Sequence, residues 1–223
     1  MSIAANLAAV RARLAAAARR AGRDPAGIEL VAVSKTQPAE AVREAWEAGQ
    51  RLFGENYAQE LRDKAEALAD LEGLRFHFIG RLQRNKARYV APVAAMLESL
   101  DGLELARELD KRAAAAGRIL PALVEVNLGE EQKGGVPAAG LGGFLEQVGA
   151  LPALRVEGLM CIPPFSEDPE SSRPWFVRMR ALAAEHGLKV LSMGMSTDFE
   201  VAIEEGATHV RVGTAIFGAR PQR

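Results

Sequence analysis

The sequence predicts an α/β protein that forms a single (β/α)8 barrel of the TIM type, with one extra helix at the N-terminus. Three observations predict it. The chain of 223 residues is long enough for one domain with a large core. Eight apolar strand candidates alternate with helical stretches. No linker, repeat or low-complexity tract interrupts this alternation, so we expect residues 1–223 to be one domain.

The first element is a helix over residues 1–22. Its apolar side chains recur at spacings of three and four, and arginines occupy much of the remaining surface. The stripe consists of Ile3, Leu7, Val10, Leu14 and Ala17. A basic amphipathic helix can lie on a membrane surface, but the simpler interpretation is a helix packed on the barrel.

The strand candidates follow that helix at regular intervals. They are residues 28–35, 51–55, 75–80, 96–100, 119–128, 155–162, 190–195 and 208–212. A doubly wound open sheet is the alternative arrangement. The barrel is preferred because the strand count fits and no GxGxxG motif follows the first strand.

Composition excludes several classes of protein. The formal net charge of −1 gives no general attraction to nucleic acid or membranes, and no apolar run approaches the roughly 20 residues of a membrane span. No signal peptide is apparent, and the single cysteine, Cys161, cannot form an intramolecular disulfide. We therefore expect a cytoplasmic protein. His186 and His209 show no metal-ligand spacing with Cys161, so no metal site is expected.

A lysine ends the first strand candidate, in the run VAVSKT. Placing an ammonium group at the end of an apolar strand is costly, and the amine of Lys35 is suited to forming an imine with an aldehyde. The alternative is a surface lysine just beyond the strand.

Hydroxyl groups follow the seventh strand candidate. Ser196 and Thr197 precede a predicted helix, and Thr197 and Glu200 have the spacing of a capping box. A helix N-terminus with nearby hydroxyls can bind phosphate. The alternative is a cap without a ligand.

The eighth strand candidate leads into the run VRVGTA. Alternation turns Val210 and Val212 toward the helices, and Arg211 and Gly213 toward the barrel interior. A glycine there allows close backbone approach to a ligand, whereas the inward arginine could belong to a structural ion pair. Phosphate sites recur after strands seven and eight of such barrels. Pyridoxal 5′-phosphate (PLP) carries an aldehyde and a phosphate, and would satisfy both features at once.

The sequence pattern assigns no cofactor role to three further residues. His77 alternates with Phe76 and Phe78, and is interpreted as a hydrogen-bonded core histidine rather than a ligand. Tyr57 follows the second strand candidate and could approach the barrel mouth. Lys133 lies in a glycine-rich loop.

Seven segments in order along the chain resemble the pyridoxal phosphate homeostasis protein family, which is related to the N-terminal barrel of alanine racemase. They are residues 31–36 (VAVSKT), 53–60 (FGENYAQE), 77–86 (HFIGRLQRNK), 126–134 (VNLGEEQKG), 158–163 (GLMCIP), 191–198 (LSMGMSTD) and 210–220 (VRVGTAIFGAR). Because they run from the first strand to the last, the resemblance covers essentially the whole chain.

The resemblance implies a role for each matching position. Lys35 would form the Schiff base with PLP, and Arg211 would face the pyridine nitrogen. Asn56 would lie beside the ring, with Met193 near it. The phosphate would be held by Ser196, Thr197, Gly213 and Thr214.

The resemblance also implies a monomeric, non-catalytic carrier that limits free PLP and delivers it to apo PLP-dependent enzymes. The fixed charge of Arg211 would disfavour protonation of the pyridine nitrogen, which weakens the ring as an electron sink. Two alternatives stay open. One is a PLP-dependent amino-acid racemase or related PLP enzyme. The other is a barrel enzyme whose Lys35 forms an imine with a phosphorylated sugar.

Overall fold

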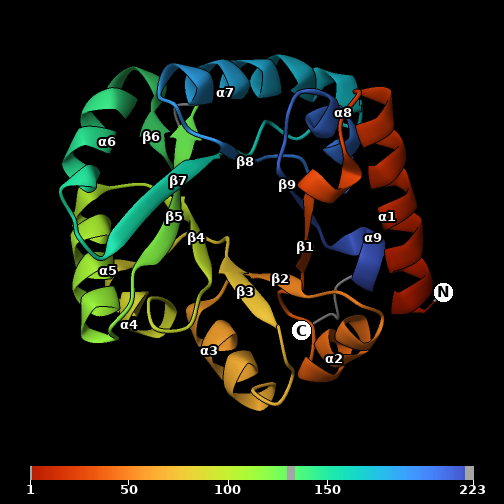
Figure 1. The fold of residues 1–223 in the computed structure, drawn as a ribbon, viewed down its shortest axis with the longest axis horizontal. Coiled ribbons are helices and arrows are strands. Elements are labelled where there is room, and N and C mark those ends of the chain that lie inside the picture. The colour runs from red at the N-terminus through yellow and green to blue at the C-terminus, as the bar shows by residue number, and fades with distance from the viewer. Residues whose placement is uncertain (1, 130–133, 219–223) are drawn as a thin grey trace.

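A computed structural model describes residues 2–129 and 134–218 of the chain. Parallel strands close into a barrel inside a ring of helices (Figure 1). The barrel strands are β1 (Glu29–Val33), β2 (Leu52–Glu55), β3 (Arg75–Phe78), β4 (Met96–Leu100), β5 (Leu120–Asn127), β7 (Leu154–Met160), β8 (Val190–Ser192) and β9 (His209–Val212). The pairing of β9 with β1, and of β4 with β5, leaves these eight strands without a free edge.

Helices separate the strands and cover the outside of the barrel (Figure 1). They are α1 (Ile3–Arg20), α2 (Ala39–Glu47), α3 (Ala58–Ala67), α4 (Ala87–Val90), α5 (Leu103–Ala115), α6 (Leu141–Gly149), α7 (Arg173–Glu185), α8 (Phe199–Glu204) and α9 (Thr214–Phe217). The barrel predicted from the sequence is confirmed, and each predicted strand has a counterpart.

Two strand details differ from the prediction. A short strand, β6 (Val136–Pro137), pairs with the end of β5 outside the barrel and was not expected. The strand predicted over residues 190–195 ends at Ser192. Gly194 follows at φ +90°, and a Cβ there would lie 2.5 Å from the Cβ of Ala202. The chain must therefore leave the strand at a glycine to pass close to α8.

The N-terminal helix packs on the barrel as predicted. Leu7, Val10 and Leu14 are buried on one face of α1, which lies against α8 and α9 (Figure 1). Arg13 and Arg20 pair with Glu200 and Glu204 of α8. The predicted apolar stripe is therefore buried against the rest of the domain. None of the helices in residues 2–129 and 134–218 is long and apolar enough to cross a membrane.

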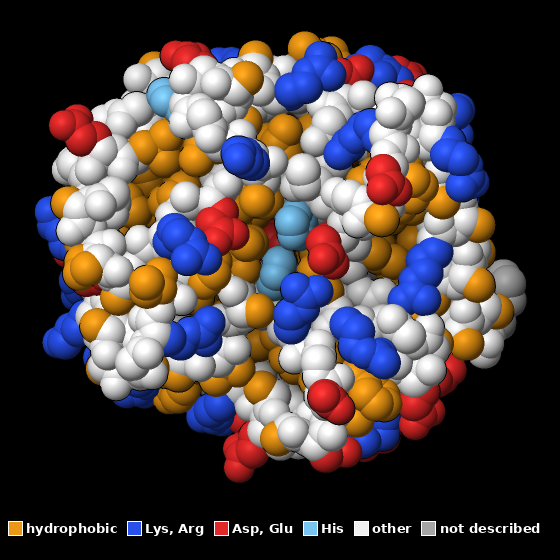
Figure 2. Space-filling model, viewed as in Figure 1, with side chains coloured by type: hydrophobic (Ala, Val, Ile, Leu, Met, Phe, Trp, Pro, Cys, Tyr) orange, Lys and Arg blue, Asp and Glu red, His pale blue; other side chains and the backbone are white. Residues whose placement is uncertain are grey.

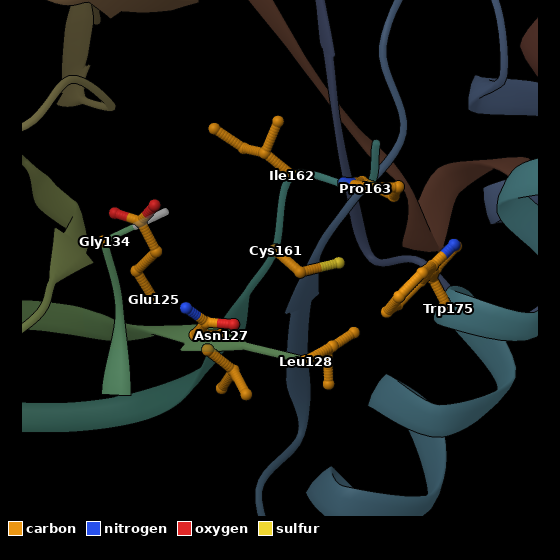
Figure 3. Close-up of a pocket in the computed structure, with 9 residues that line it drawn as sticks. Glu125, Asn127, Leu128, Gly134, Cys161, Ile162, Pro163 and Trp175 are labelled. Carbon is orange, nitrogen blue, oxygen red and sulfur yellow. The ribbon is translucent and has the colours of Figure 1, made fainter. Parts of the chain in front are cut away.

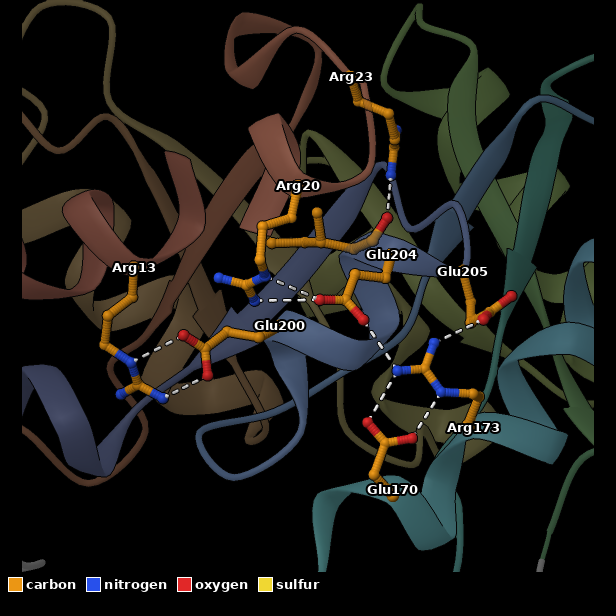
Figure 4. A network of polar contacts seen from close by, with 9 residues as sticks. Arg13, Arg20, Arg23, Glu170, Arg173, Glu200, Glu204 and Glu205 are labelled. Atoms are coloured by element: carbon orange, nitrogen blue, oxygen red, sulfur yellow. Dashed lines mark hydrogen bonds and ion pairs between the residues drawn. The ribbon is translucent and has the colours of Figure 1, made fainter. Parts of the chain in front are cut away.

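An ion-pair network continues from α8 to α7 (Figure 4). Arg173, at the start of α7, pairs with Glu170, Glu204 and Glu205 at 2.6–2.8 Å. Glu204 therefore joins Arg173 to Arg20, so α1 is tied to α7 and α8, which lie far from it in the sequence, on the outside of the barrel.

Candidate cofactor site

A cavity of ≈ 350 Å³ opens where the carboxyl ends of the barrel strands meet. It is lined by Val33, Lys35, Gln37, Asn56, Ile79, Ile162, Phe165, Met195, Ser196, Thr197, Arg211, Gly213, Thr214, Phe217 and Gly218. Seven of the eight predicted site residues are among them, although they lie in or after four different strands. The parallel arrangement explains this, since it brings the carboxyl ends of all strands to one face.

Met193 is the predicted site residue that does not line the cavity. It is fully buried in the apolar core. The neighbouring Ser192 points into the barrel, where its hydroxyl contacts Glu98 and Arg211. Alternation therefore turns Met193 outward toward the helices. Met195 lines the cavity instead, because the chain has left the strand at Gly194.

Lys35 lies directly after β1, between the loops that follow β2 and β9. The register pairs Val33 with Gly54 of β2, and Ala32 with Val212 of β9. Continuing the register places Asn56 level with Lys35 on one side, and Gly213 level with Val33 on the other. The side chain of Lys35 is half-buried at the cavity wall.

Arg211 faces inward, as the alternation in β9 predicts, and is only 4% exposed. One guanidinium nitrogen, Nη1, donates to the hydroxyl of Ser192 at 2.7 Å. The other, Nη2, donates to the carbonyl oxygen of Cys161 at 2.8 Å. Two directed hydrogen bonds hold the planar group in one orientation at the cavity.

A buried carboxylate lies behind Arg211. Ser192 donates its hydroxyl proton to Oε2 of Glu98 at 2.6 Å, and Nδ1 of His77 contacts Oε1 of Glu98 at 2.6 Å. Burial acts to raise the pKa of Glu98, but the hydrogen bond with His77 and the nearby charges outweigh it and lower the pKa to about 2. Glu98 is therefore an anion inside the barrel, linked to Arg211 through one hydroxyl.

The chain of polar contacts from Arg211 through Ser192 and Glu98 ends at a pair of histidines. The rings of His77 and His209 stack with centroids 5.7 Å apart, and His209 is the first residue of β9. Figure 2, which looks along the barrel, shows histidine atoms at the centre of the face, with acidic and basic side chains around them. Burial lowers the pKa of His209. The interpretation of His77 as a hydrogen-bonded core histidine is confirmed.

The predicted capping box is wrong. Helix α8 begins at Phe199, and Asp198 rather than Thr197 precedes it. The carboxylate of Asp198 accepts hydrogen bonds from the Met195 amide at 2.7 Å and the Ser172 hydroxyl at 2.8 Å. Aspartate takes this place because its two oxygens can hold the loop and α7 together. Among the described residues, the hydroxyls of Ser196 and Thr197 have no hydrogen-bond partner, and both line the cavity.

Gly213 and Thr214 supply the other half of the candidate anion site. A Cβ at Gly213 would lie 3.2 Å from the carbonyl oxygen of Val33, so the missing side chain lets β9 pass close to β1. Thr214 begins α9 and is exposed at the cavity rim.

Asn56 carries an unsatisfied acceptor. Its Oδ1 atom is buried without a hydrogen-bond partner in the described part of the chain. A Cβ at Gly80 would lie 2.4 Å from the carbonyl oxygen of Asn56, so this backbone segment is closely packed and has little freedom to move. A buried acceptor in a rigid cavity wall suits a ligand that brings a donor.

Two neighbouring cavities are less suitable. The pocket in Figure 3, between the end of β5 and Trp175 of α7, measures ≈ 20 Å³ and has room for little more than a water molecule. A cavity of ≈ 560 Å³ is lined by Tyr57, Arg81 and Lys86 but not by Lys35. The loop residue Lys133 lies outside the described residues.

Comparison with known proteins agrees with this geometry. The family model for the alanine racemase N-terminal domain matches residues 5–221. The pyridoxal phosphate homeostasis protein of Aquifex aeolicus is 46% identical over 227 residues, covering 99% of each chain. That of Pseudomonas aeruginosa is 48% identical over 222 residues, covering 98% of this chain and 96% of the relative. This chain belongs to the pyridoxal phosphate homeostasis protein family.

Solved structures extend the family likeness. PipY of Synechococcus elongatus PCC7942, determined with PLP bound, is 38% identical, with a TM-score of 0.87 over 97% of this chain and all of that one. Alanine racemase from Corynebacterium glutamicum matches 97% of this chain at 20% identity and a TM-score of 0.66, using 62% of its own length. The racemase shares the barrel fold.

Proposed function

We propose that this chain binds PLP through a Schiff base to Lys35 and serves in PLP homeostasis as a carrier rather than a catalyst. The observation that supports it is one cavity that joins an amine, a fixed guanidinium and two hydroxyl-bearing loops. The names of the Aquifex and Pseudomonas relatives and the PLP-bound PipY structure point to the same cofactor.

The lining residues fit the cofactor at both of its polar ends. When bound, PLP supplies an aldehyde for the linkage and a ring that can withdraw electrons. Lys35 would provide the linking nitrogen, and Ser196, Thr197 and Thr214 would donate hydroxyl hydrogen bonds to the phosphate, with the backbone at Gly213. Asn56 would lie beside the ring, where a ligand donor would satisfy its buried Oδ1.

Arg211 would face the pyridine nitrogen. Its orientation is fixed by Ser192 and Cys161, so a positive charge stays beside the ring. That charge disfavours protonation of the pyridine nitrogen, and the ring becomes a weaker electron sink. Such a site favours holding PLP over stabilising carbanions.

The lining residues also argue for a carrier rather than a racemase. Racemisation commonly uses an acid/base group on each face of the substrate. Lys35 and Arg211 are the ionisable lining residues in the described part of the chain. Tyr57 is 51% exposed and lines the neighbouring cavity, and Tyr89 packs beneath Arg62 and Arg88 at 5.0 and 4.7 Å from its ring. We further infer a monomer that delivers PLP to apo PLP-dependent enzymes in the cytoplasm.

Borohydride reduction followed by peptide mass spectrometry tests the linkage. We expect the pyridoxyl group on Lys35, and none in Lys35→Ala protein of unchanged melting temperature. Lys86→Ala, which removes a lysine from the neighbouring cavity, is the matched control and should keep the adduct. A fully occupied adduct in Lys35→Ala would assign the linkage to another lysine and overturn the proposal.

A further inference from the structure

A buried ionic cluster lies beside Lys35 but outside the cavity lining. It joins the end of β1, the end of β2 and the helix α3. Its members are Ser34, Thr36, Glu55, Glu60 and Lys64, none of which lines the candidate cofactor cavity. Ser34 and Thr36 are the two chain neighbours of Lys35, so the cluster acts on the backbone that carries the linking amine.

Lys64 holds the peptide group that precedes Lys35. Its side chain is 7% exposed, and Nζ donates to the carbonyl oxygen of Ser34 at 2.6 Å. The same nitrogen donates to Oε1 of Glu55 and Oε1 of Glu60, each at 2.7 Å. An ammonium group has three protons, and three acceptors are in place for them, which offsets much of the cost of burying the charge.

Glu60 holds the peptide group that follows Lys35. Its Oε1 accepts the backbone proton of Thr36 at 2.7 Å. Thr36 has φ +63° and is the one non-glycine residue with a positive φ in residues 2–129 and 134–218. This conformation is costly for a β-branched residue and persists where its surroundings impose it. Because Lys64 also bonds to Glu60, the two anchors form one unit, the Glu60–Lys64 pair.

The ammonium group of Lys64 also partners a buried carboxyl group, that of Glu55. It is fully buried, and its Oε1 accepts from both the Ser34 hydroxyl and Lys64. Burial raises the pKa of Glu55 against the pull of Lys64 and Ser34. The other oxygen, Oε2, has no partner among the described residues. The Thr36 hydroxyl is also buried without a partner there, so the cluster satisfies the backbone beside Lys35 at the expense of two of its own polar atoms.

We propose that Glu60 and Lys64 are positioning residues for Lys35, which hold the peptide groups on both sides of it so that its amine is presented to the cavity. The inference rests on the proposed Schiff base. To form that bond, the neutral nitrogen of Lys35 adds to the aldehyde carbon, and the aldehyde oxygen leaves as water. A fixed backbone keeps the amine within reach both before the bond forms and after it opens.

The pair should affect the covalent step and not the rest of cofactor binding. Neither side chain lines the cavity, so contacts to the ring and phosphate stay intact without them. Pyridoxamine 5′-phosphate has the same ring and phosphate but an amine in place of the aldehyde, so it reports non-covalent binding alone. Comparing the two ligands separates positioning of Lys35 from general support of the cavity.

The experiment uses Glu60→Ala, Glu60→Gln and Lys64→Met in the full chain, with Glu66→Ala as an exposed control on the same helix. We expect Glu60→Ala and Lys64→Met to lower the rate constant for appearance of the Schiff-base absorption band by on the order of 10- to 100-fold. Glu60→Gln keeps an oxygen acceptor for the Thr36 amide and should restore most of that rate. Pyridoxamine 5′-phosphate affinity should match wild type in all four variants.

Two results would overturn the inference: equal losses for both ligands, or wild-type kinetics in Glu60→Ala. Should Lys64→Met not fold, the Glu60 variants decide, since the Thr36 amide is held by Glu60. Wild-type protein that forms no reducible adduct at Lys35 would instead refute the proposed function itself. The two failures are therefore distinguishable.

Discussion

At the cofactor cavity, the behaviour of single side chains depends on partners from distant strands. Arg211 of β9 is oriented by Ser192 of β8, and Ser192 in turn bonds to Glu98 of β4. A buried cation and a buried anion thus share one hydroxyl. The pairing explains how a guanidinium that is 4% exposed can be kept inside the barrel.

The two hydroxyls after β8 should discriminate between PLP and pyridoxal. Replacing Ser196 and Thr197 together with alanine removes donors that contribute about 1.5–3 kcal/mol each when they bond to a charged group. We expect PLP affinity to fall by roughly 100-fold or more, and pyridoxal affinity to change little, in equilibrium titrations of both ligands. Equal losses of affinity for PLP and pyridoxal would show that these two hydroxyls do not bind the phosphate. Gly213 is a poorer target, because a side chain there also meets Val33.

Glu98 should make stability depend on pH in the acid range. Its folded-state pKa of about 2 lies below the ordinary value of 4.5. Between these values the unfolded chain binds the proton more readily, so the stabilisation is complete above pH 4.5 and is lost as pH falls toward 2. Glu98→Gln should remove on the order of a few kcal/mol at neutral pH and flatten this part of the profile. Denaturant unfolding at several pH values measures this dependence. Parallel stability profiles for wild type and Glu98→Gln would contradict the low pKa of Glu98.

Among the elements, α1 supports the cavity from outside the barrel. Its apolar stripe packs on α8 and α9, which follow the two strands whose loops would bind phosphate. The side-chain amide of Asn6 also donates to the carbonyl oxygen of Ile216 in α9 at 2.9 Å. The extra N-terminal helix is therefore part of the scaffold of the candidate site.

Truncating the stripe should destabilise the whole domain. Leu7 is 1% exposed, and Leu7→Ala leaves a cavity between α1 and its neighbours. We expect the free energy of unfolding to fall by about 2–5 kcal/mol in urea titrations. Arg19→Ala, on the exposed face of the same helix, should stay within about 0.5 kcal/mol of wild type. A Leu7→Ala effect as small as that of the control would mean that α1 is loosely attached.

For the whole molecule, the barrel separates two polar regions. The candidate cofactor cavity occupies the carboxyl ends of the strands, whereas His209 begins β9 at the opposite end. The line from His77 through Glu98 and Ser192 to Arg211 connects them through the interior. Among the described residues, Lys35 is the lysine that lines the candidate cavity, and neither tyrosine of the chain lines it.

The carrier proposal predicts negligible amino-acid racemase activity. PLP-loaded protein incubated with L-alanine should show no change in enantiomer ratio by chiral chromatography. Racemisation commonly uses an acid/base group on each face of the substrate, and Lys35 and Arg211 are the ionisable residues among the described residues that line the cavity. Tyr57, in the adjoining cavity, is the residue to check. Turnover of about 1 s⁻¹ or more that is lost in Tyr57→Phe would refute a carrier-only function.

Much of the fold could be predicted because strand and helix periodicity are local. Each of the eight barrel strands was located from its own apolar run, and the stripe of α1 from its own spacing. Lys35, Ser196, Thr197, Arg211 and Gly213 could be proposed for a related reason, since each stands near the end of a predicted strand. Asn56 and Thr214 came from the family resemblance alone. Parallel strands in a closed barrel bring those ends together whatever the loops between them do.

The sequence by itself therefore determined the barrel and the face on which the candidate site lies. Tertiary structure alone decided which side chains support that face. Glu98 and Ser192 are 94 positions apart and meet because the barrel interior joins β4 and β8. Met195 lines the cavity in place of the predicted Met193 because Gly194 passes close to α8. The hydrogen bond from the Thr36 amide to Glu60 depends on where α3 packs. These contacts arise between segments whose separation in sequence carries no periodic signal, so only the closed barrel brings them into contact.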